Sequence, residues 1–117
     1  MAFRFETLRI WQDSRSFSLQ IYTLTKKFPR EEVFSLTDQV RRATNSIVAN
    51  IAEGSASSSK KDFAHYLDIA IKSLYETVAH LHIAQDQNYI SKTELDFLYH
   101  EADTLSRKIR AFRKSLL

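Results

Sequence analysis

Residues 36–54 of the chain read LTDQVRRATNSIVANIAEG. Apolar side chains recur in this segment every three or four residues, which is the spacing of one face of an α-helix. One stripe, ending on a polar residue, consists of Leu36, Val40, Ala43, Ile47 and Asn50, and a second consists of Thr44, Val48 and Ile51. Because apolar or small residues cover most of the circumference between Ala43 and Ala52, we expect this helix to be buried by more than its own domain.

Both ends of this helix carry capping signals. Ser35 is a good N-cap residue, and Asp38 follows it at the third position, as in a capping box. Gly54 is the only glycine in the chain. We expect it just after the last helical residue, where the backbone needs a positive φ, which gives a helix over residues 36–53.

Three more helices are predicted around this one, at about residues 8–28, 60–87 and 92–115. Their apolar stripes comprise Ile10, Ser14, Phe17, Ile21, Leu24 and Phe28 in the first; Phe63, Leu67, Ala70, Leu74, Thr77, Leu81 and Ala84, widened by Ile71, Tyr75 and Val78, in the next; and Leu98, Ala102, Leu105, Ile109, Phe112 and Leu116 in the last. Pro29 ends the first helix, while Ser59 with Asp62 and Ser91 with Glu94 form capping patterns. Short connections force antiparallel neighbours, so we predict an all-α, up-down-up-down four-helix bundle in one domain, residues 1–117.

The composition excludes most other architectures. The 117 residues include one glycine, one proline and no cysteine, so Gly-rich phosphate loops, disulfides and sulfur-ligated zinc are not available. No apolar run is long enough to span a bilayer, and the N-terminus lacks the apolar core of a signal peptide. We therefore expect a soluble, cytoplasmic protein without a membrane role.

Residue types suited to catalysis or metal binding do not form a recognisable pattern. Glu76 with His80 and Asp96 with His100 are i,i+4 pairs, but the repeated Glu-x-x-His motif of a bundle di-metal site is absent. No serine lies in a Gly-x-Ser-x-Gly elbow. We expect a protein that is not an enzyme and that has no cofactor and no metal.

Charge placement is more informative than the net charge of +3. In the predicted bundle the N-terminus, the 53–62 turn and the C-terminal tail share one end. Nine basic residues lie there: Arg4, Arg9, Lys60, Lys61, Arg107, Lys108, Arg110, Arg113 and Lys114. Only Glu6, Glu53 and Asp62 oppose them, whereas the other end has six basic and eight acidic residues. Such a cluster is typical of phosphate binding, although the helix dipole also favours cations in a last helical turn, and both interpretations stay open.

The segment at residues 33–54 resembles the family of small four-helix-bundle proteins encoded in intervening sequences of bacterial 23S rRNA genes. The residues that carry the resemblance are Leu36, Gln39, Arg41, Arg42, Ala43, Ser46, Ile47, Asn50, Ile51, Ala52, Glu53 and Gly54. The similarity continues through residues 11–12, 28–29, 61–63 and 69–76. Two departures are Lys72, where the family usually has glycine, and the serine-rich loop after Gly54, where an arginine often follows.

The resemblance implies a bundle that assembles into a ring, typically a homopentamer. A related branch, the accessory proteins of diversity-generating retroelements, is similar in fold, and its members are pentameric, basic and bind a reverse transcriptase and nucleic acid. In a ring, Arg41 and Arg42 would form ion pairs with Glu53 of another subunit, since guanidinium forks bind carboxylates bidentately. The remaining candidates for the interface or for a structural motif are Gln39, Ser46, Asn50 and Gly54.

We therefore predict a non-enzymatic, ring-forming protein that binds RNA or DNA through phosphate contacts at its basic end. Five basic ends on one rim would form a multivalent anion-binding surface. The alternative is an adaptor whose helix faces dock another protein, with the basic end serving solubility alone.

Overall fold

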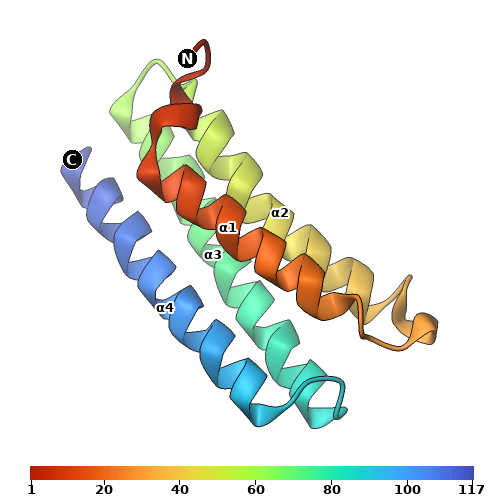
Figure 1. Ribbon diagram of the computed structural model, residues 1–117. Helices are drawn as coiled ribbons and strands as arrows, with labels where there is room; N and C mark the ends of the chain where they lie inside the picture. The colour runs from red at the N-terminus through yellow and green to blue at the C-terminus, as the bar shows by residue number, and fades with distance from the viewer.

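The computed structural model describes residues 1–117 and contains four α-helices and no strands (Figure 1). The elements are η1 (Arg4–Thr7), α1 (Arg9–Thr25), η2 (Arg30–Glu32), α2 (Leu36–Ser55), α3 (Lys60–Asp86) and α4 (Lys92–Ser115). Successive helices run antiparallel, and each packs against two others, so that α1 neighbours α2 and α4 while α3 neighbours α2 and α4. This arrangement confirms the predicted all-α class with four helices.

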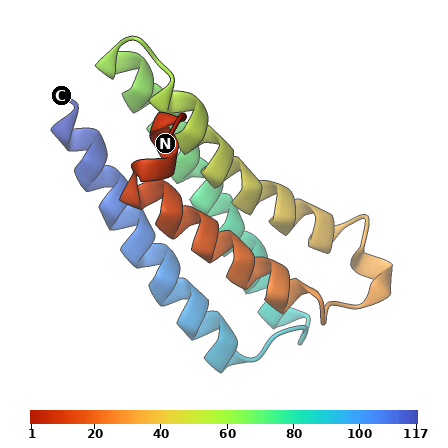
Figure 2. The ribbon, with the colours of Figure 1, turned by 45° about the horizontal axis from the view of Figure 1, so that its top comes forward.

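The helices form an elongated body with extents of 44 × 23 × 22 Å. Both chain termini and the α2–α3 turn lie at one end of the long axis, and the α1–α2 and α3–α4 connections lie at the other (Figures 1 and 2). None of the four helices combines the length and the apolarity that crossing a membrane requires.

The predicted apolar stripes meet in one core between the four helices. The completely buried side chains include Ile21, Ile47, Ile51, Leu67, Leu81 and Ile109. Ser14 is also completely buried, and its hydroxyl donates to the Trp11 carbonyl at 2.8 Å, so this polar side chain is satisfied within its own helix. On the outer side of α2, Val48 and Ala52 are half-buried and Ala49 is exposed. That face of α2 is therefore open to solvent in the single chain.

Gly54 has a different role from the one predicted. It lies inside α2, which continues to Ser55, and no glycine has a positive φ. A Cβ atom on Gly54 would lie 2.7 Å from the Tyr66 Cβ and 2.8 Å from Phe63 Cδ1. Glycine is therefore needed at this position because α2 and α3 approach each other closely. The residue with a positive φ is Asn88, at 62°, in the α3–α4 turn.

The predicted N-cap position of α2 is confirmed, but the expected capping bond is absent. Ser35 is the N-cap residue, and its side chain makes no capping hydrogen bond. Instead, the Leu36 N–H donates to Glu32 Oε1 at 3.3 Å, and Tyr89 Oη donates to Glu32 Oε2 at 2.7 Å. Asp38 pairs with Arg42 rather than with the helix N-terminus. The carboxylate of η2 thus replaces the expected serine and ties the α1–α2 connection to the α3–α4 turn.

The caps of α3 and α4 are confirmed. The Asp62 N–H donates to Ser59 Oγ at 3.0 Å. Ser91 and Glu94 form a reciprocal capping box, with hydrogen bonds of 3.1 Å and 2.9 Å. The first helix ends at Thr25, earlier than expected, because the chain tightens there and the Phe28 N–H donates to the Thr25 carbonyl, three residues back.

Candidate functional site

The structure brings the basic segments together at the end of the bundle that holds both termini. Arg4 lies in η1, Arg9 opens α1, and Lys60 and Lys61 open α3. The other five predicted residues, Arg107, Lys108, Arg110, Arg113 and Lys114, lie in the last turns of α4. We call these nine residues the basic end.

Four of the nine cations are neutralised by aspartates that the sequence prediction did not assign to this end. Three such pairs are Arg107 with Asp103 at 3.1 Å, Arg113 with Asp68 at 2.7 Å, and Lys108 with Asp13 at 3.0 Å. Arg9 also binds Asp13, at 3.1 Å. The predicted positive charge of this end was therefore too large. Two of the ion pairs join different helices, and the other two join residues one turn apart in α1 and in α4.

Asp13 shows how firmly these pairs are held. Burial opposes ionisation of this carboxyl group, but hydrogen bonds from Lys108 and Arg9 outweigh burial and lower its pKa. Asp13 therefore stays charged at neutral pH and keeps both cations engaged.

The other five cations of the basic end have no carboxylate within 4.0 Å. These unpaired cations are Arg4, Lys60, Lys61, Arg110 and Lys114, and all five are exposed. The Arg4 guanidinium lies over the Phe63 ring, 5.2 Å from its centroid, which holds η1 against α3. Phe112 packs against the same ring, with centroids 5.4 Å apart, as expected for a residue of the core.

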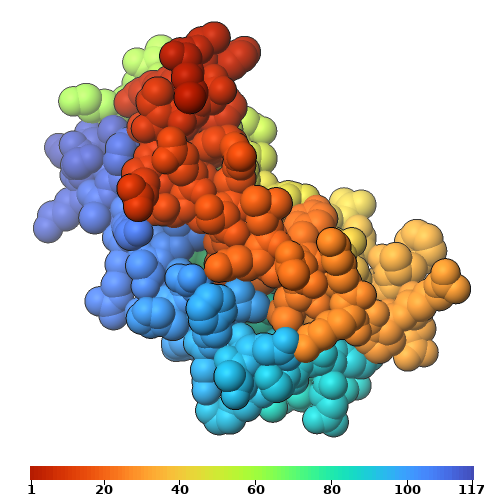
Figure 3. Space-filling model, viewed as in Figure 1, coloured from red at the N-terminus to blue at the C-terminus, as the bar shows by residue number.

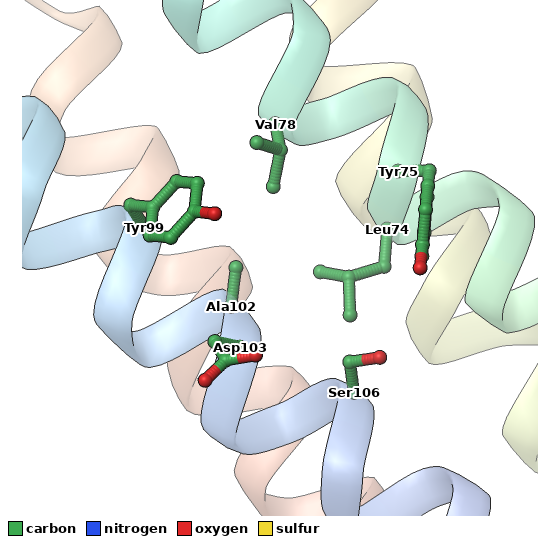
Figure 4. Close-up of a pocket in the computed structure, with 7 residues that line it drawn as sticks. All are labelled: Leu74, Tyr75, Val78, Tyr99, Ala102, Asp103 and Ser106. Atoms are coloured by element: carbon green, nitrogen blue, oxygen red, sulfur yellow. The ribbon is translucent and has the colours of Figure 1, made fainter.

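A groove runs between α3 and α4, and one of these unpaired cations, Arg110, lines part of it. One open cavity of about 200 Å³ is lined by Leu74, Tyr75, Val78, Tyr99, Ala102, Asp103 and Ser106 (Figure 4). A second cavity of about 460 Å³ is lined by Asp68, Ile71, Lys72, Tyr75 and Arg110. Tyr75 belongs to both cavities, so we call them together the Tyr75 groove.

Tyr75 is not a core residue, contrary to the sequence prediction. Its side chain is 62% exposed, and Tyr99 on the other wall of the groove is 54% exposed. Tyr75 shares a helix face with Lys61, Asp68 and Lys72, because the four residues are spaced seven, four and three positions apart. That polar face is the signal that identifies Tyr75 as a surface residue.

The α2 residues that carry the family resemblance make contacts within the chain. Arg41 Nε donates to Thr25 Oγ1 at 2.9 Å, and its guanidinium lies 4.7 Å from the Tyr22 ring centroid. Arg42 pairs with Asp38 at 2.9 Å. Arg41 forms no ion pair, and the only carboxylate paired with Arg42 is Asp38, one helical turn away. The ion pairs predicted with Glu53 of another subunit therefore stay a prediction.

Ser46 and Asn50 belong to a polar cluster between α2 and α3. The Ser73 hydroxyl donates to Ser46 Oγ at 2.8 Å, and Asn50 Nδ2 donates to the same oxygen at 3.0 Å. Asn50 is half-buried, so it lies at the edge of the core. Gln39 and Glu53 are exposed, and the chain forms hydrogen bonds with their backbone atoms but not with their side chains.

Three exposed apolar side chains lie toward the opposite end of the bundle from the basic end, apart from those at the two chain termini. Phe34, just after η2, is 93% exposed. Leu19 of α1 and Phe97 of α4 are 60% and 55% exposed. The last two line an open groove of about 750 Å³ between α1 and α4, together with Leu24 and Leu98, on the face shown in Figure 3.

The histidines do not form a metal site. No group of three or more His, Cys, Asp or Glu side chains is placed to hold a metal ion. His80 Nε2 lies 3.1 Å from Glu76 Oε2, and the His82 ring lies edge-on to Tyr99. These histidines make local contacts on the surface of α3.

Three comparisons place the chain among known proteins. Residues 6–111 match the family model described as 23S rRNA-intervening sequence protein, which confirms the resemblance seen in the sequence. The chain is also similar to the crystal structure of a protein of unknown function from the S23 ribosomal protein family of Bacteroides thetaiotaomicron, with 26% identity and a TM-score of 0.82. That alignment covers 90% of this chain and 98% of the other. No curated protein matches the chain.

Proposed function

The chain belongs to the 23S rRNA-intervening sequence protein family, and we propose that it is a ring-forming, non-enzymatic protein that binds nucleic acid through phosphate contacts at its basic end. The observation that carries the proposal is the set of five exposed, unpaired cations on η1, α3 and α4. Cations already bound to aspartates gain little from a phosphate, whereas unpaired ones release counterions from the nucleic acid when they bind.

The number of unpaired cations sets the expected salt dependence. If each of the five neutralises one phosphate, the logarithm of the association constant falls with the logarithm of salt concentration with a slope of about −4 to −5 per protomer. Because the contacts are to phosphates, they carry no base sequence information. We therefore expect similar affinity for different sequences of the same length.

Fluorescence anisotropy with a structured RNA and a duplex DNA across a salt series tests this function. We expect micromolar or tighter binding at low salt. A variant with Lys60, Lys61 and Lys114 changed to Glu should bind far more weakly and lose about three units of the salt slope. The matched control changes Lys26, Arg30 and Lys92, which are also exposed, to Glu. It alters the net charge equally at the other end and should bind almost as wild type. Absence of binding at low salt refutes the proposal.

We also propose that copies assemble through the apolar surfaces at the opposite end. Phe34 lies on the α1–α2 connection, and the groove lined by Leu19 and Phe97 lies between α1 and α4. Contact between two different surfaces of identical subunits is heterologous, and it generates a ring when the rotation closes. An aromatic side chain that is 93% exposed is a suitable anchor for such a contact.

Light scattering tests the assembly. We expect a wild-type mass that is a multiple of 13.7 kDa, about fivefold for the pentamer that the family resemblance implies. Phe34→Ser should shift the mass toward a single chain, while Ile83→Ser, which removes another exposed apolar side chain from α3, should not. A wild-type mass of one chain at working concentration contradicts the assembly.

A second candidate function is docking of a different protein on the same apolar groove between α1 and α4. Its width and its exposed Leu19 and Phe97 favour a helix of a partner as well as a second copy. Capture of a defined partner that survives nuclease and high salt, and that Phe97→Ala abolishes, supports this alternative.

A further inference from the structure

The Tyr75 groove differs from the rest of the basic end because it combines exposed aromatic rings with cations. Tyr75 and Tyr99 stand on its two helices, and Figure 4 shows them on facing walls with Leu74, Val78 and Ala102 between them. Lys72 and Arg110 line the part of the groove nearer the basic end. A phosphate-binding patch alone would not need aromatic side chains on its surface.

Tyr75 is held in place although it is exposed. Arg110 Nη2 donates to the Tyr75 hydroxyl at 3.2 Å, and the guanidinium carbon lies 5.9 Å from the ring centroid. A ring fixed by such contacts loses little conformational entropy when a planar ligand stacks on it. The same arginine leaves donors for a phosphate, because a guanidinium carries five N–H groups.

The cations around Tyr75 are available to a ligand. Lys72 and Arg110 are exposed and have no carboxylate within 4.0 Å. Asp68, the acidic residue of this part of the groove, is occupied by the 2.7 Å pair with Arg113. The electrostatic preference of this segment is therefore for an anion.

We propose that the Tyr75 groove binds a single-stranded segment of nucleic acid, with bases stacked on Tyr75 and Tyr99 and phosphates on Lys72, Arg110 and Lys114. This inference rests on the proposed function and assigns the form of nucleic acid that the site selects. Only unpaired bases expose their faces for stacking on aromatic side chains, and a duplex hides them. The distance along α4 from Tyr99 to Lys114 is roughly 22 Å at 1.5 Å per residue, which accommodates a few nucleotides.

The test compares a fluorescein-labelled single-stranded RNA 12-mer with the same 12-mer in a duplex, using the full chain. Tyr75→Ala should weaken single-strand binding by about 5- to 150-fold, the range for loss of one base stack, and change duplex binding less than twofold. Tyr75→Phe should retain single-strand binding, because it keeps the ring. Ile83→Ala, which truncates another exposed apolar side chain of α3 outside both grooves, is the control and should have no effect.

The outcomes separate this inference from the proposed function. If the wild type binds neither the single strand nor the duplex, the proposed function itself is contradicted. Duplex binding by the wild type, combined with single-strand binding that Tyr75→Ala leaves unchanged, overturns the groove inference alone. A DNA 12-mer of the same sequence shows whether the 2′-hydroxyl contributes, and circular dichroism shows that each variant is folded.

Discussion

Replacing Gly54 by alanine tests the finding that this glycine is required by the approach of α2 and α3. Alanine is the better helix former, and at an ordinary position inside a helix the change would stabilise the protein by about 1 kcal/mol. Here the new Cβ would lie 2.7 Å from the Tyr66 Cβ and 2.8 Å from Phe63 Cδ1. Carbon atoms pack best at about 3.5–4.0 Å, so both contacts are too short.

The two contacts differ in how they can be relieved. Phe63 can adjust its ring slightly, but the Tyr66 Cβ is fixed to the backbone of α3, so the helices must separate locally by about 0.8 Å or more to reach the optimal distance. Overpacking costs about 1–3 kcal/mol, and because two contacts are too short we expect the upper part of this range, about 2–3 kcal/mol. After the gain of about 1 kcal/mol in helix propensity, the net loss is about 1–2 kcal/mol, which lowers Tm by roughly 4–8 °C.

Urea unfolding followed by circular dichroism at one fixed protein concentration measures this loss. Gly54→Asn is the informative second variant, because asparagine tolerates a positive φ but is larger than alanine. Close packing predicts that Gly54→Asn is less stable than Gly54→Ala, whereas a helix-ending glycine predicts the reverse order. An alanine variant as stable as wild type would refute the packing argument.

Two further predictions concern the helix ends. Ser91→Ala should lower the free energy of unfolding by about 1 kcal/mol, because it removes a capping hydrogen bond. Ser35→Ala should leave the free energy of unfolding nearly unchanged. An equal loss in both variants contradicts the assigned capping bonds. Hydrogen bonds from Tyr89 and the Leu36 N–H lower the pKa of Glu32, so this carboxylate stabilises the fold above its unfolded pKa of about 4.3 and ceases to do so as the pH falls through the lowered value. Glu32→Gln should therefore lower Tm at pH 7 but not at a pH well below the lowered pKa of Glu32, where its carboxyl group is protonated in both states. An effect independent of pH argues against this role.

The local features of the fold could be predicted from sequence. The main stripes of α3 and α4 are buried as expected, apart from the last turns of α4, because helical periodicity determines which side chains share a face. Of the residues expected to widen the α3 stripe, Tyr75 is exposed. The caps formed by Ser59 and Ser91 depend on residues three positions apart, so the sequence also identifies them. The family resemblance rests on the same kind of local pattern and is confirmed.

The candidate site was predicted only in outline. The topology of four antiparallel helices was sufficient to bring the nine cations to one end. Which of them are unpaired depends on contacts between helices, such as Lys108 with Asp13 and Arg113 with Asp68, which are far apart in the chain. The exposure of Tyr75 was missed because an apolar stripe does not define its own edges, although the polar residues that share its helix face indicate it.

The amino-acid order was enough to predict the helical class, the helix faces and the end of the molecule where positive charge collects. These properties follow from periodicity and from short connections, which act between neighbouring residues. The packed structure was needed to show that Gly54 lets α2 and α3 approach closely, and that the Leu36 N–H donates to the Glu32 carboxylate rather than to the Ser35 side chain. Both outcomes depend on distances between segments remote in the chain, and such distances are set by packing of the whole core.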